Sequence, residues 1–589
     1  MSKMLEDYDH LLNIHYDRDY QIPFTGSESH ITTAGRKTEK LDGIWRFAAD
    51  VFDTFIRKKF FEEISTDEKG RDKPVDFDFD QWEQVKVPSN WNLQKEKYWF
   101  FEGTGIYTRK FKFWKKSPDE RVFLRIGAAN YESRVWLNGK LIARHRGGFT
   151  PYAVELTELL KEENRLIITV NNQRKLEQIP SINYDWFNYG GLFRSIELIR
   201  VPRSFIRDFR ISLAPDGLRE SIQIAVLTDG AREFESVRVE IPELEMEEEF
   251  PVEPDGWARG TIRRNVQLWS PDCPKLYKVR VFYGEDCVEE EIGFREIQTC
   301  GKKILLNGKE IFLKGVCCHE ESLENGRALT EEEQKNILAA AKGMGCNIIR
   351  LSHYPHSERI SKLADKMGIL LWEEIPVYWA LCFDNPDTYD DAENQLEEMI
   401  KRDYNRASVV IWGIGNENPD TDERLEFMKK LNSRCKTLDQ TRLTAAACLV
   451  NIDEMKIIDR LCQYVDVVAI NEYYGWYYRD YEGLRTIFEN SDIGKPIVIS
   501  ETGADSVQGH FGDDEELFTE NHQAKLYQKQ FEIADSQVCG IFPWILFDFR
   551  SPVRLNPLQN SYNRKGLIGA DKNYKKMAYY IVKDYYQRK

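Results

Sequence analysis

Two glutamates follow apolar runs that are typical of buried strands. Glu417 comes shortly after the run at 409–414, and Glu501 directly follows the run at 496–500. If the two side chains meet, one carboxyl group can protonate a leaving oxygen while the other attacks the carbon that this oxygen leaves. These roles require surroundings that separate the two pKa values. The pair therefore indicates acid/base and nucleophilic chemistry on a glycosidic bond.

The elements around the glutamates alternate between strands and helices after residue 303. The strand-like runs lie at 311–316, 347–352, 369–372, 409–414, 443–447, 467–470, 496–500 and 540–546. Segments of helical period lie between most of them, among them 331–343, 357–367 and 394–406. Eight strands with interleaved helices predict a (β/α)₈ TIM barrel. Glu417 and Glu501 then end the fourth and seventh strands, on opposite sides of one barrel mouth.

A structural interpretation competes for each glutamate. Taken singly, a glutamate at the end of a strand more often caps a helix or joins a salt bridge than takes part in chemistry. Two such residues at one barrel mouth, with Glu417 preceded by Asn416, weaken that interpretation. A catalytically dead, sugar-binding barrel would lack at least one of the two carboxylates.

The chain before the barrel has the pattern of β-sandwiches. Alternating runs at 122–126, 134–137 and 165–170, with the turn Asn138-Gly139, predict an N-terminal β jelly-roll sandwich. The pattern continues with runs near 279–283 and 289–294, over a length that suits an immunoglobulin-like β-sandwich. We expect three domains: a jelly-roll, sugar-binding-like domain at 1–200, an immunoglobulin-like sandwich at 201–298 and a catalytic TIM barrel at 299–589.

Three longer motifs are more specific than any single residue. They are the segments 185–194 (DWFNYGGLFR), 347–355 (NIIRLSHYP) and 471–477 (NEYYGWY). Each falls where glycoside hydrolase family 2 carries a similar segment, and in the same order. The chain thus resembles this family over nearly its whole length, and resembles its bacterial β-glucuronidases most.

The resemblance implies a role for each site residue. Glu417 would be the acid/base, because the acid/base of the family follows an asparagine, and Glu501 the nucleophile. Asn416 would hydrogen-bond the sugar 2-hydroxyl. Further residues at positions that line the glycone pocket are Asp185, His353, Tyr473, Tyr477 and Trp544. The alternatives are core packing for the three aromatic residues and a structural role beside Arg350 for His353.

Asn563 and Lys565 match the Asn-x-Lys pattern by which β-glucuronidases hold the sugar carboxylate. A lysine supplies a cation and an asparagine an oriented donor. Some close relatives carry an arginine four residues before this asparagine, where the present chain has Gln559. Arg350 or Arg554 could supply the missing charge. Galacturonides therefore remain possible substrates.

The expected activity is that of a retaining exo-β-glucuronidase, which hydrolyses terminal β-D-glucuronides by double displacement through a glycosyl-enzyme on Glu501. The alternatives are a β-galacturonidase or dual-specificity uronidase, and then a β-galactosidase. The connection from 375 to 394 is short, whereas enzymes of this group that favour small drug-like conjugates often carry a long loop there. We therefore expect an open mouth and a preference for oligosaccharides that end in uronic acid.

Composition limits the partners. The 82 basic and 98 acidic residues give a net charge of −16, which argues against nucleic acid and anionic membranes as partners. We expect a glucuronide or uronic-acid-terminated oligosaccharide as substrate, and a homo-oligomer.

Cysteine and histidine usage gives no support for a metal site. The 11 cysteines are scattered without a CxxC pair, and the nine histidines have no paired spacing. We expect no metal and no cofactor for catalysis. Residues 1–7 are polar, without the apolar core of a secretion signal, and no run of about 18 apolar residues occurs. The expected location is cytoplasmic.

Overall fold

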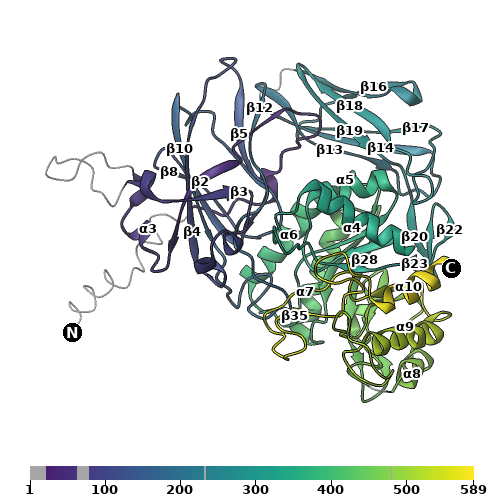
Figure 1. Ribbon diagram of the computed structural model, residues 1–589. Helices are drawn as coiled ribbons and strands as arrows, with labels where there is room; N and C mark the ends of the chain where they lie inside the picture. Colours follow the sequence, from purple (N-terminus) through teal and green to yellow (C-terminus); the bar gives the residue numbers. More distant parts are fainter. Residues whose placement is uncertain (1–21, 63–77, 231–233, 479) are drawn as a thin grey trace. The chain divides into compact units, whose positions relative to one another are not determined.

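The computed structural model describes residues 22–62, 78–230, 234–478 and 480–589 (Figure 1). The chain forms two compact units, one of Met1–Arg174 with Asn188–Phe205, the other of Lys175–Phe187 with Ile206–Lys589. The segment Lys175–Phe187 thus belongs to the second unit although both of its flanks belong to the first. Residues 1–7, on which the expectation about secretion rests, lie outside the described residues. The domain boundaries at 200 and 298 stay a prediction.

The first unit contains a two-sheet β-sandwich, as predicted. One sheet has the order β1-β12-β5-β9 and the other β3-β2-β4-β10-β7-β8. The strands are β1 (Thr38–Lys40), β2 (Gly43–Asp50), β3 (Glu83–Val87), β4 (Thr104–Lys112), β5 (Arg121–Ile126), β7 (Glu132–Leu137), β8 (Lys140–His145), β9 (Tyr152–Glu155), β10 (Glu163–Asn171) and β12 (Ile196–Val201). Asn138 and Gly139 join β7 to β8 with φ of 51° and 83°, the positive values that a tight hairpin turn requires.

A second, smaller sandwich precedes the barrel. Its sheets have the orders β13-β14-β17 and β16-β15-β18-β19. The strands are β13 (Ser204–Leu213), β14 (Ser221–Gly230), β15 (Ser236–Ile241), β16 (Met246–Pro251), β17 (Trp257–Arg263), β18 (Tyr277–Tyr283) and β19 (Asp286–Ile292). Inward residues such as Val237, Val239 and Ile241 are fully buried in alternation with more exposed neighbours, as the sequence pattern predicted.

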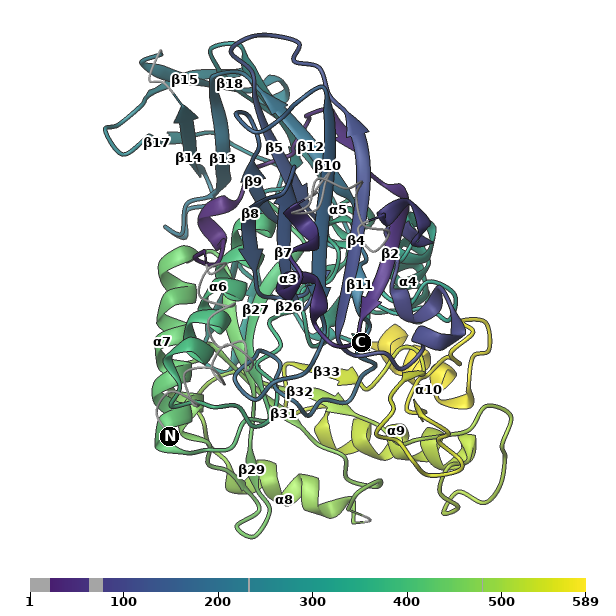
Figure 2. The same ribbon diagram turned by 90° about the vertical axis from the view of Figure 1, so that its left-hand side faces the viewer.

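The barrel is confirmed, with its first strand in two pieces. β23 (Leu313–Lys314) pairs with the last strand and β24 (Cys317–Cys318) with the second, so that the parallel sheet closes. The other strands are β25 (Ile348–Leu351), β26 (Leu370–Glu374), β27 (Val409–Asn416), β28 (Leu443–Cys448), β31 (Val467–Asn471), β32 (Ile497–Thr502) and β33 (Gly540–Pro543). Figure 2 shows β31, β32 and β33 side by side.

Helices cover the outside of the barrel (Figure 1). They are α4 (Glu331–Met344), α5 (Glu358–Met367), α6 (Pro386–Asp403), α7 (Asp422–Leu438), α8 (Glu482–Asn490), α9 (Glu520–Ala534) and α10 (Met577–Arg588). The helix expected at 394–406 begins earlier, at Pro386, because the Asn385 side chain caps it by accepting from the Asp387 N–H. The connection before it is therefore even shorter than expected. No helix in the described part of the chain is long and apolar enough to cross a membrane.

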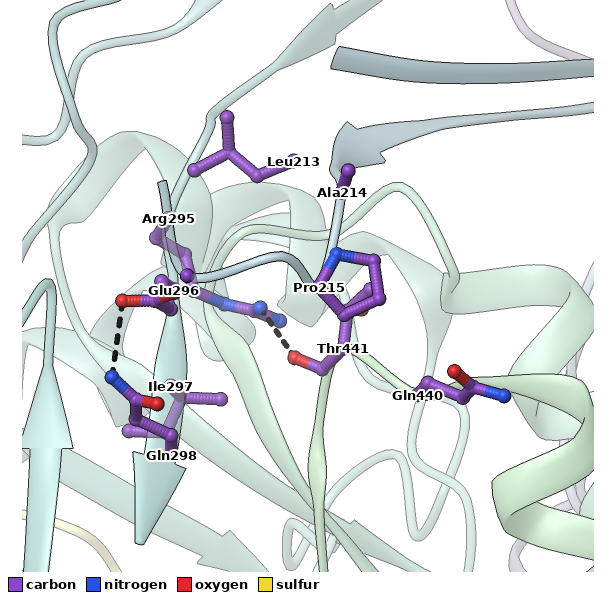
Figure 3. A pocket seen from close by; sticks show the side chains of 10 residues that line it. Leu213, Ala214, Pro215, Arg295, Glu296, Ile297, Gln298, Gln440 and Thr441 are labelled. Carbon is purple, nitrogen blue, oxygen red and sulfur yellow. Dashed lines mark hydrogen bonds between the residues drawn. The ribbon is translucent and has the colours of Figure 1, made fainter. Parts of the chain in front are cut away.

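Arg295 joins the smaller sandwich to the base of the barrel. Its buried guanidinium donates to the main-chain oxygens of Ala407, Thr441 and Val409, at 3.1, 2.8 and 2.6 Å. Figure 3 shows the bond to Thr441 at the wall of a pocket of about 170 Å³. Burial, together with the charge of Arg442, lowers the pKa of Arg295 to about 9. The contact between the smaller sandwich and the barrel is therefore made by hydrogen bonds to main-chain carbonyl groups, which carry no charge.

Replacing Arg295 by methionine should destabilise the second unit, which contains the smaller sandwich and the barrel. The carbonyl groups of Ala407 and Thr441 would lose this donor, whereas that of Val409 keeps a hydrogen bond from Arg442. We expect the free energy of unfolding to fall by about 2 kcal/mol. The control is Arg280→Met in the same sandwich, where the side chain is 38% exposed and pairs with Glu289. That change should cost less than about 0.5 kcal/mol. Urea unfolding followed by tryptophan fluorescence measures both; equal midpoints for the two variants would refute the role of Arg295.

Candidate active site

The two predicted glutamates lie at the ends of two barrel strands, β27 and β32, which are separated in the sheet by β28 and β31. Glu417 comes directly after β27, with a left-handed φ of 51° that a non-glycine residue adopts at some energetic cost. Glu501 lies within β32, and its Cα is paired in register with Asn471 at the end of β31. Asn471 also donates to Glu417 Oε1 at 3.0 Å, so it connects the surroundings of the two carboxyl groups.

Arg350, on β25, is fully buried and contacts Glu501. It donates to Glu501 Oε1 at 2.8 Å, to both carboxylate oxygens of Glu374 at 2.9 and 3.0 Å, and to Asn416 Oδ1 at 2.8 Å. Burial opposes the charge of Arg350, but the carboxylates of Glu374 and Glu501 outweigh it and raise the pKa of the guanidinium. Arg350 is therefore committed to these groups and is not the cation that replaces the missing arginine at position 559.

Glu501 has two donors of different kinds. Oε1 faces Arg350, and Oε2 accepts from the Tyr473 hydroxyl at 2.7 Å. Burial raises the pKa of Glu501 above its usual value; the charge of Glu417 acts in the same direction, whereas Arg350, His353 and the Tyr473 hydrogen bond oppose it. The two donors hold both carboxylate oxygens in place.

Glu417 lies in different surroundings. Its side chain is only half-buried, and Oε2 accepts from the indole nitrogen of Trp379 at 2.8 Å while Oε1 accepts from Asn471. No cation is recorded within salt-bridge distance of it in the described part of the chain. One carboxyl group thus pairs with a buried cation and the other with neutral donors, which is the asymmetry that two different roles require.

Asn416 is placed to donate to a ligand. Its oxygen accepts from Arg350 and from Asn471, at 2.8 and 3.2 Å. Its amide nitrogen is buried and has no hydrogen-bond partner among the described residues. A buried amide donor without a partner is costly unless a bound group accepts from it.

His353 contacts carboxylates and an aromatic ring. Its Nδ1 lies 2.6 Å from Glu374 Oε1, and its Nε2 lies 3.7 Å from Glu501 Oε1. Its ring stacks on Trp544, with centroids 5.0 Å apart and planes at 21°. Burial alone would raise the pKa of Glu374, but Arg350 and His353 hold it below its usual value.

The expected carboxylate clamp contains a cation that is already paired. Lys565 Nζ donates to Asp505 Oδ2 at 2.6 Å and to the Tyr477 hydroxyl at 3.3 Å. Burial opposes the charge on Lys565, yet Asp505 raises the pKa of the amine. Gln559 donates to the other oxygen of Asp505 at 3.1 Å. The side chain that replaces an arginine of some relatives thus supports the partner of Lys565.

A second ion pair, of Arg554 with Asp185, lies beside the ion pair of Lys565 with Asp505. Asp185 accepts from Asn563 at 3.2 Å, from the Arg554 side chain and from the Ser551 hydroxyl. Arg554 also lies 3.4 Å from the Tyr477 hydroxyl, so that Arg554 and Lys565 approach the same oxygen. Asp185 therefore contacts Asn563 of the expected clamp, and its place in a sugar pocket stays a prediction. Arg564, between Asn563 and Lys565, lies over the Tyr562 ring instead.

Several residues of the site were not found from the sequence. Glu374 ends a strand, and this position was its only signal; Asn471 ends a strand and also opens the motif 471–477. Tyr378 is buried between Trp186 and His353, with ring centroids 5.0 and 4.8 Å away. Neither Tyr378 nor Trp379 has a sequence pattern of its own. In the described residues, no group of three or more His, Cys, Asp or Glu side chains could hold a metal ion.

Comparison with known proteins gives the same result for both halves of the chain. Residues 38–202 match the sugar binding domain of glycosyl hydrolases family 2, and residues 297–589 match the TIM barrel domain of that family. A β-glucuronidase from Paenibacillus borealis is 27% identical over 589 residues, which cover 91% of this chain and 94% of the relative.

Solved structures are similar over nearly the whole length. A β-glucuronidase from an uncultured Clostridium species matches with a TM-score of 0.83 and 27% identity, over 95% of this chain and 99% of the other. A β-galacturonidase from Eisenbergiella tayi, bound to glycerol, matches with a TM-score of 0.80 and 25% identity, over 97% and 98% of the two chains. Since both family domains occur in order and the fold agrees throughout, the chain belongs to glycosyl hydrolase family 2.

Proposed function

We propose that this glycoside hydrolase is a retaining exo-β-glucuronidase, with Glu501 as nucleophile and Glu417 as acid/base. The observation that carries the proposal is a pair of tyrosines. Tyr473 donates to Glu501, Tyr477 accepts from Lys565, and their ring centroids lie 5.3 Å apart. A buried cation is therefore positioned close to a nucleophile, as a terminal sugar with a carboxylate at C6 requires.

The geometry supports a double displacement. In the first step the Glu501 carboxylate attacks the anomeric carbon and Glu417 donates its proton to the leaving oxygen. In the second step Glu417 accepts a proton from water, the water oxygen attacks the same carbon, and the bond to Glu501 breaks. The unpartnered amide of Asn416 would donate to the sugar 2-hydroxyl. His353 and Trp544, stacked on each other beside Glu501, would form the floor of the glycone pocket.

Galacturonides are the second candidate substrate. Gln559 is uncharged and occupied by Asp505, while Arg554 is paired with Asp185 at the same pocket. This arrangement differs from that of relatives with an arginine near the clamp, and a β-galacturonidase is among the similar structures. Because Arg554 has further N–H groups beside Tyr477, we propose it as the group that distinguishes the two uronates. A cytoplasmic location, a homo-oligomer and independence of cofactors remain predictions.

Substitutions of the two glutamates should impair turnover in different ways. Glu501→Gln should abolish turnover and leave the fold intact, because an amide cannot form the glycosyl-enzyme. Glu417→Ala should keep the first step for activated leaving groups, and azide should restore the second. Steady-state kinetics with 2,4-dinitrophenyl β-glucuronide, with and without azide, measures both. Wild-type rates for Glu501→Gln, or no azide rescue of Glu417→Ala, would reject the corresponding role.

Tyr473 should set the acidic limb of the pH profile. The nucleophile acts as a carboxylate, so activity is lost as the pH falls through the pKa of Glu501, which is already raised. The Tyr473 hydrogen bond lowers that pKa, so Tyr473→Phe should move the acidic limb of kcat/KM to higher pH and reduce the rate at pH 7 by about tenfold. Tyr477→Phe is the matched control, since this hydroxyl contacts Lys565 and not Glu501. An unmoved limb for Tyr473→Phe would exclude this role.

The clamp should act on uronates and spare neutral sugars. Lys565→Ala removes the cation and leaves Asp505 unpaired, so kcat/KM for p-nitrophenyl β-glucuronide should fall by about 10²-fold, or about 2.7 kcal/mol. Activity on the matching β-glucoside should fall far less. Arg564→Ala, which removes the neighbouring charge, is the control. Assays on β-glucuronide, β-galacturonide, β-galactoside and β-glucoside test the variants; a fastest wild-type rate on a neutral sugar would refute the proposed substrate class.

A further inference from the structure

Trp379 contacts the acid/base directly and lies in the short connection between β26 and α6. Two hydrogen bonds hold its main chain: the N–H donates to the main-chain oxygen of Asn416 at 2.9 Å, and the main-chain oxygen accepts from the Asn418 side chain at 2.7 Å. Trp379 has a left-handed φ of 54°, close to the 51° of Glu417. Two neighbouring non-glycine residues in this costly conformation indicate a backbone that is held for function.

The indole and the Glu417 carboxylate form one hydrogen-bonded unit. The indole N–H donates to Oε2 at 2.8 Å, and Asn471 donates to Oε1 at 3.0 Å. With both oxygens occupied, the carboxyl group has one preferred orientation.

The position of Trp379 is on the side of the leaving group. An acid/base protonates the glycosidic oxygen, so its carboxyl group lies between the terminal sugar and the group that departs. Trp186, Tyr378 and Trp379 form an aromatic row, with ring centroids 5.0 and 4.5 Å apart. The row begins in the glycone pocket, where Trp186 and Tyr378 are buried, and ends at Trp379, which is only half-buried. The end of the row therefore presents part of an indole ring to whatever is attached to the sugar.

We propose that Trp379 positions the Glu417 carboxyl group and forms the wall of the subsite for the leaving group, with a ring face for an apolar sugar face or an aryl ring. Flat aromatic side chains suit both kinds of group, because each offers an apolar face for contact. This inference rests on the proposed function, since it takes Glu417 as the acid/base. It also changes the expectation of a bare, open mouth: the short connection supplies an aromatic wall without a long loop.

The test compares two substitutions at one position. Trp379→Phe keeps an aromatic ring and removes the N–H, whereas Trp379→Ala removes both. Trp379→Phe should reduce kcat/KM at least about tenfold for methyl β-glucuronide, whose leaving group needs a proton, and less than about threefold for the 2,4-dinitrophenyl glycoside. Trp379→Ala should in addition raise KM for a glucuronic-acid-terminated disaccharide.

Leu381→Ala is the matched control. Leu381 lies two residues further along the same connection and packs against the barrel core, so the change loosens the segment without removing the contact with Glu417. It should affect all leaving groups alike. Equal losses for all leaving groups in Trp379→Phe would overturn the positioning role, and an unchanged KM in Trp379→Ala would overturn the subsite.

The Glu417→Ala variant distinguishes a failure of the proposed function from a failure of the inference about Trp379. If it shows no dependence on the leaving group, the assignment of the acid/base fails and the role of Trp379 fails with it. If Glu417→Ala depends on the leaving group and Trp379→Phe does not, only the inference about Trp379 fails. Melting temperatures of all variants exclude loss of the fold as the cause.

Discussion

The site depends on one buried cation, Arg350. A guanidinium without contact to solvent must have its charge compensated, and here the carboxylates of Glu374 and Glu501 do so while Asn416 takes a further hydrogen bond. These partners come from three other strands, so a single side chain fixes their relative positions. Removing any one of them would leave a charge or a donor unpaired in the barrel interior. The orientation of Glu501, the proposed nucleophile, is thus tied to the packing of the barrel itself.

A different electrostatic arrangement holds the residues assigned to the sugar carboxylate. Lys565 is paired with Asp505, and Arg554 with Asp185, so neither cation is a free charge that attracts any anion. A uronate would instead compete for the remaining N–H groups of two preorganised pairs. Such a pocket would select by the direction of its donors more than by net charge, so the proposed acidic substrate does not require a basic protein.

The sequence predicted what strand periodicity and strand ends determine. The barrel strands and both glutamates lie where the strand pattern placed them, since each is governed by local alternation or by the end of a strand. Asn563 and Lys565 were found from the family resemblance instead. The start of α6 was missed, although Asn385-Pro386 is a capping signal. Trp379 and the Arg554–Asp185 pair could not be predicted from local pattern, because their partners lie 38 and 369 residues away along the chain. Their contacts form only when segments far apart in the sequence come together in the fold.

The segment Lys175–Phe187 has a consequence for how such an enzyme can be assembled and inherited. It leaves the first unit, contributes Asp185 and Trp186 to the barrel mouth and returns. A barrel transferred alone to another protein would carry both glutamates but leave Arg554 without its carboxylate and His353 without the Trp186 ring. During synthesis, most of the chain is translated between Asp185 and Arg554, so Asp185 lacks this partner until Arg554 has left the ribosome. The gene segment that encodes the barrel is therefore not a transferable module, and evolution must keep the two parts of the chain together.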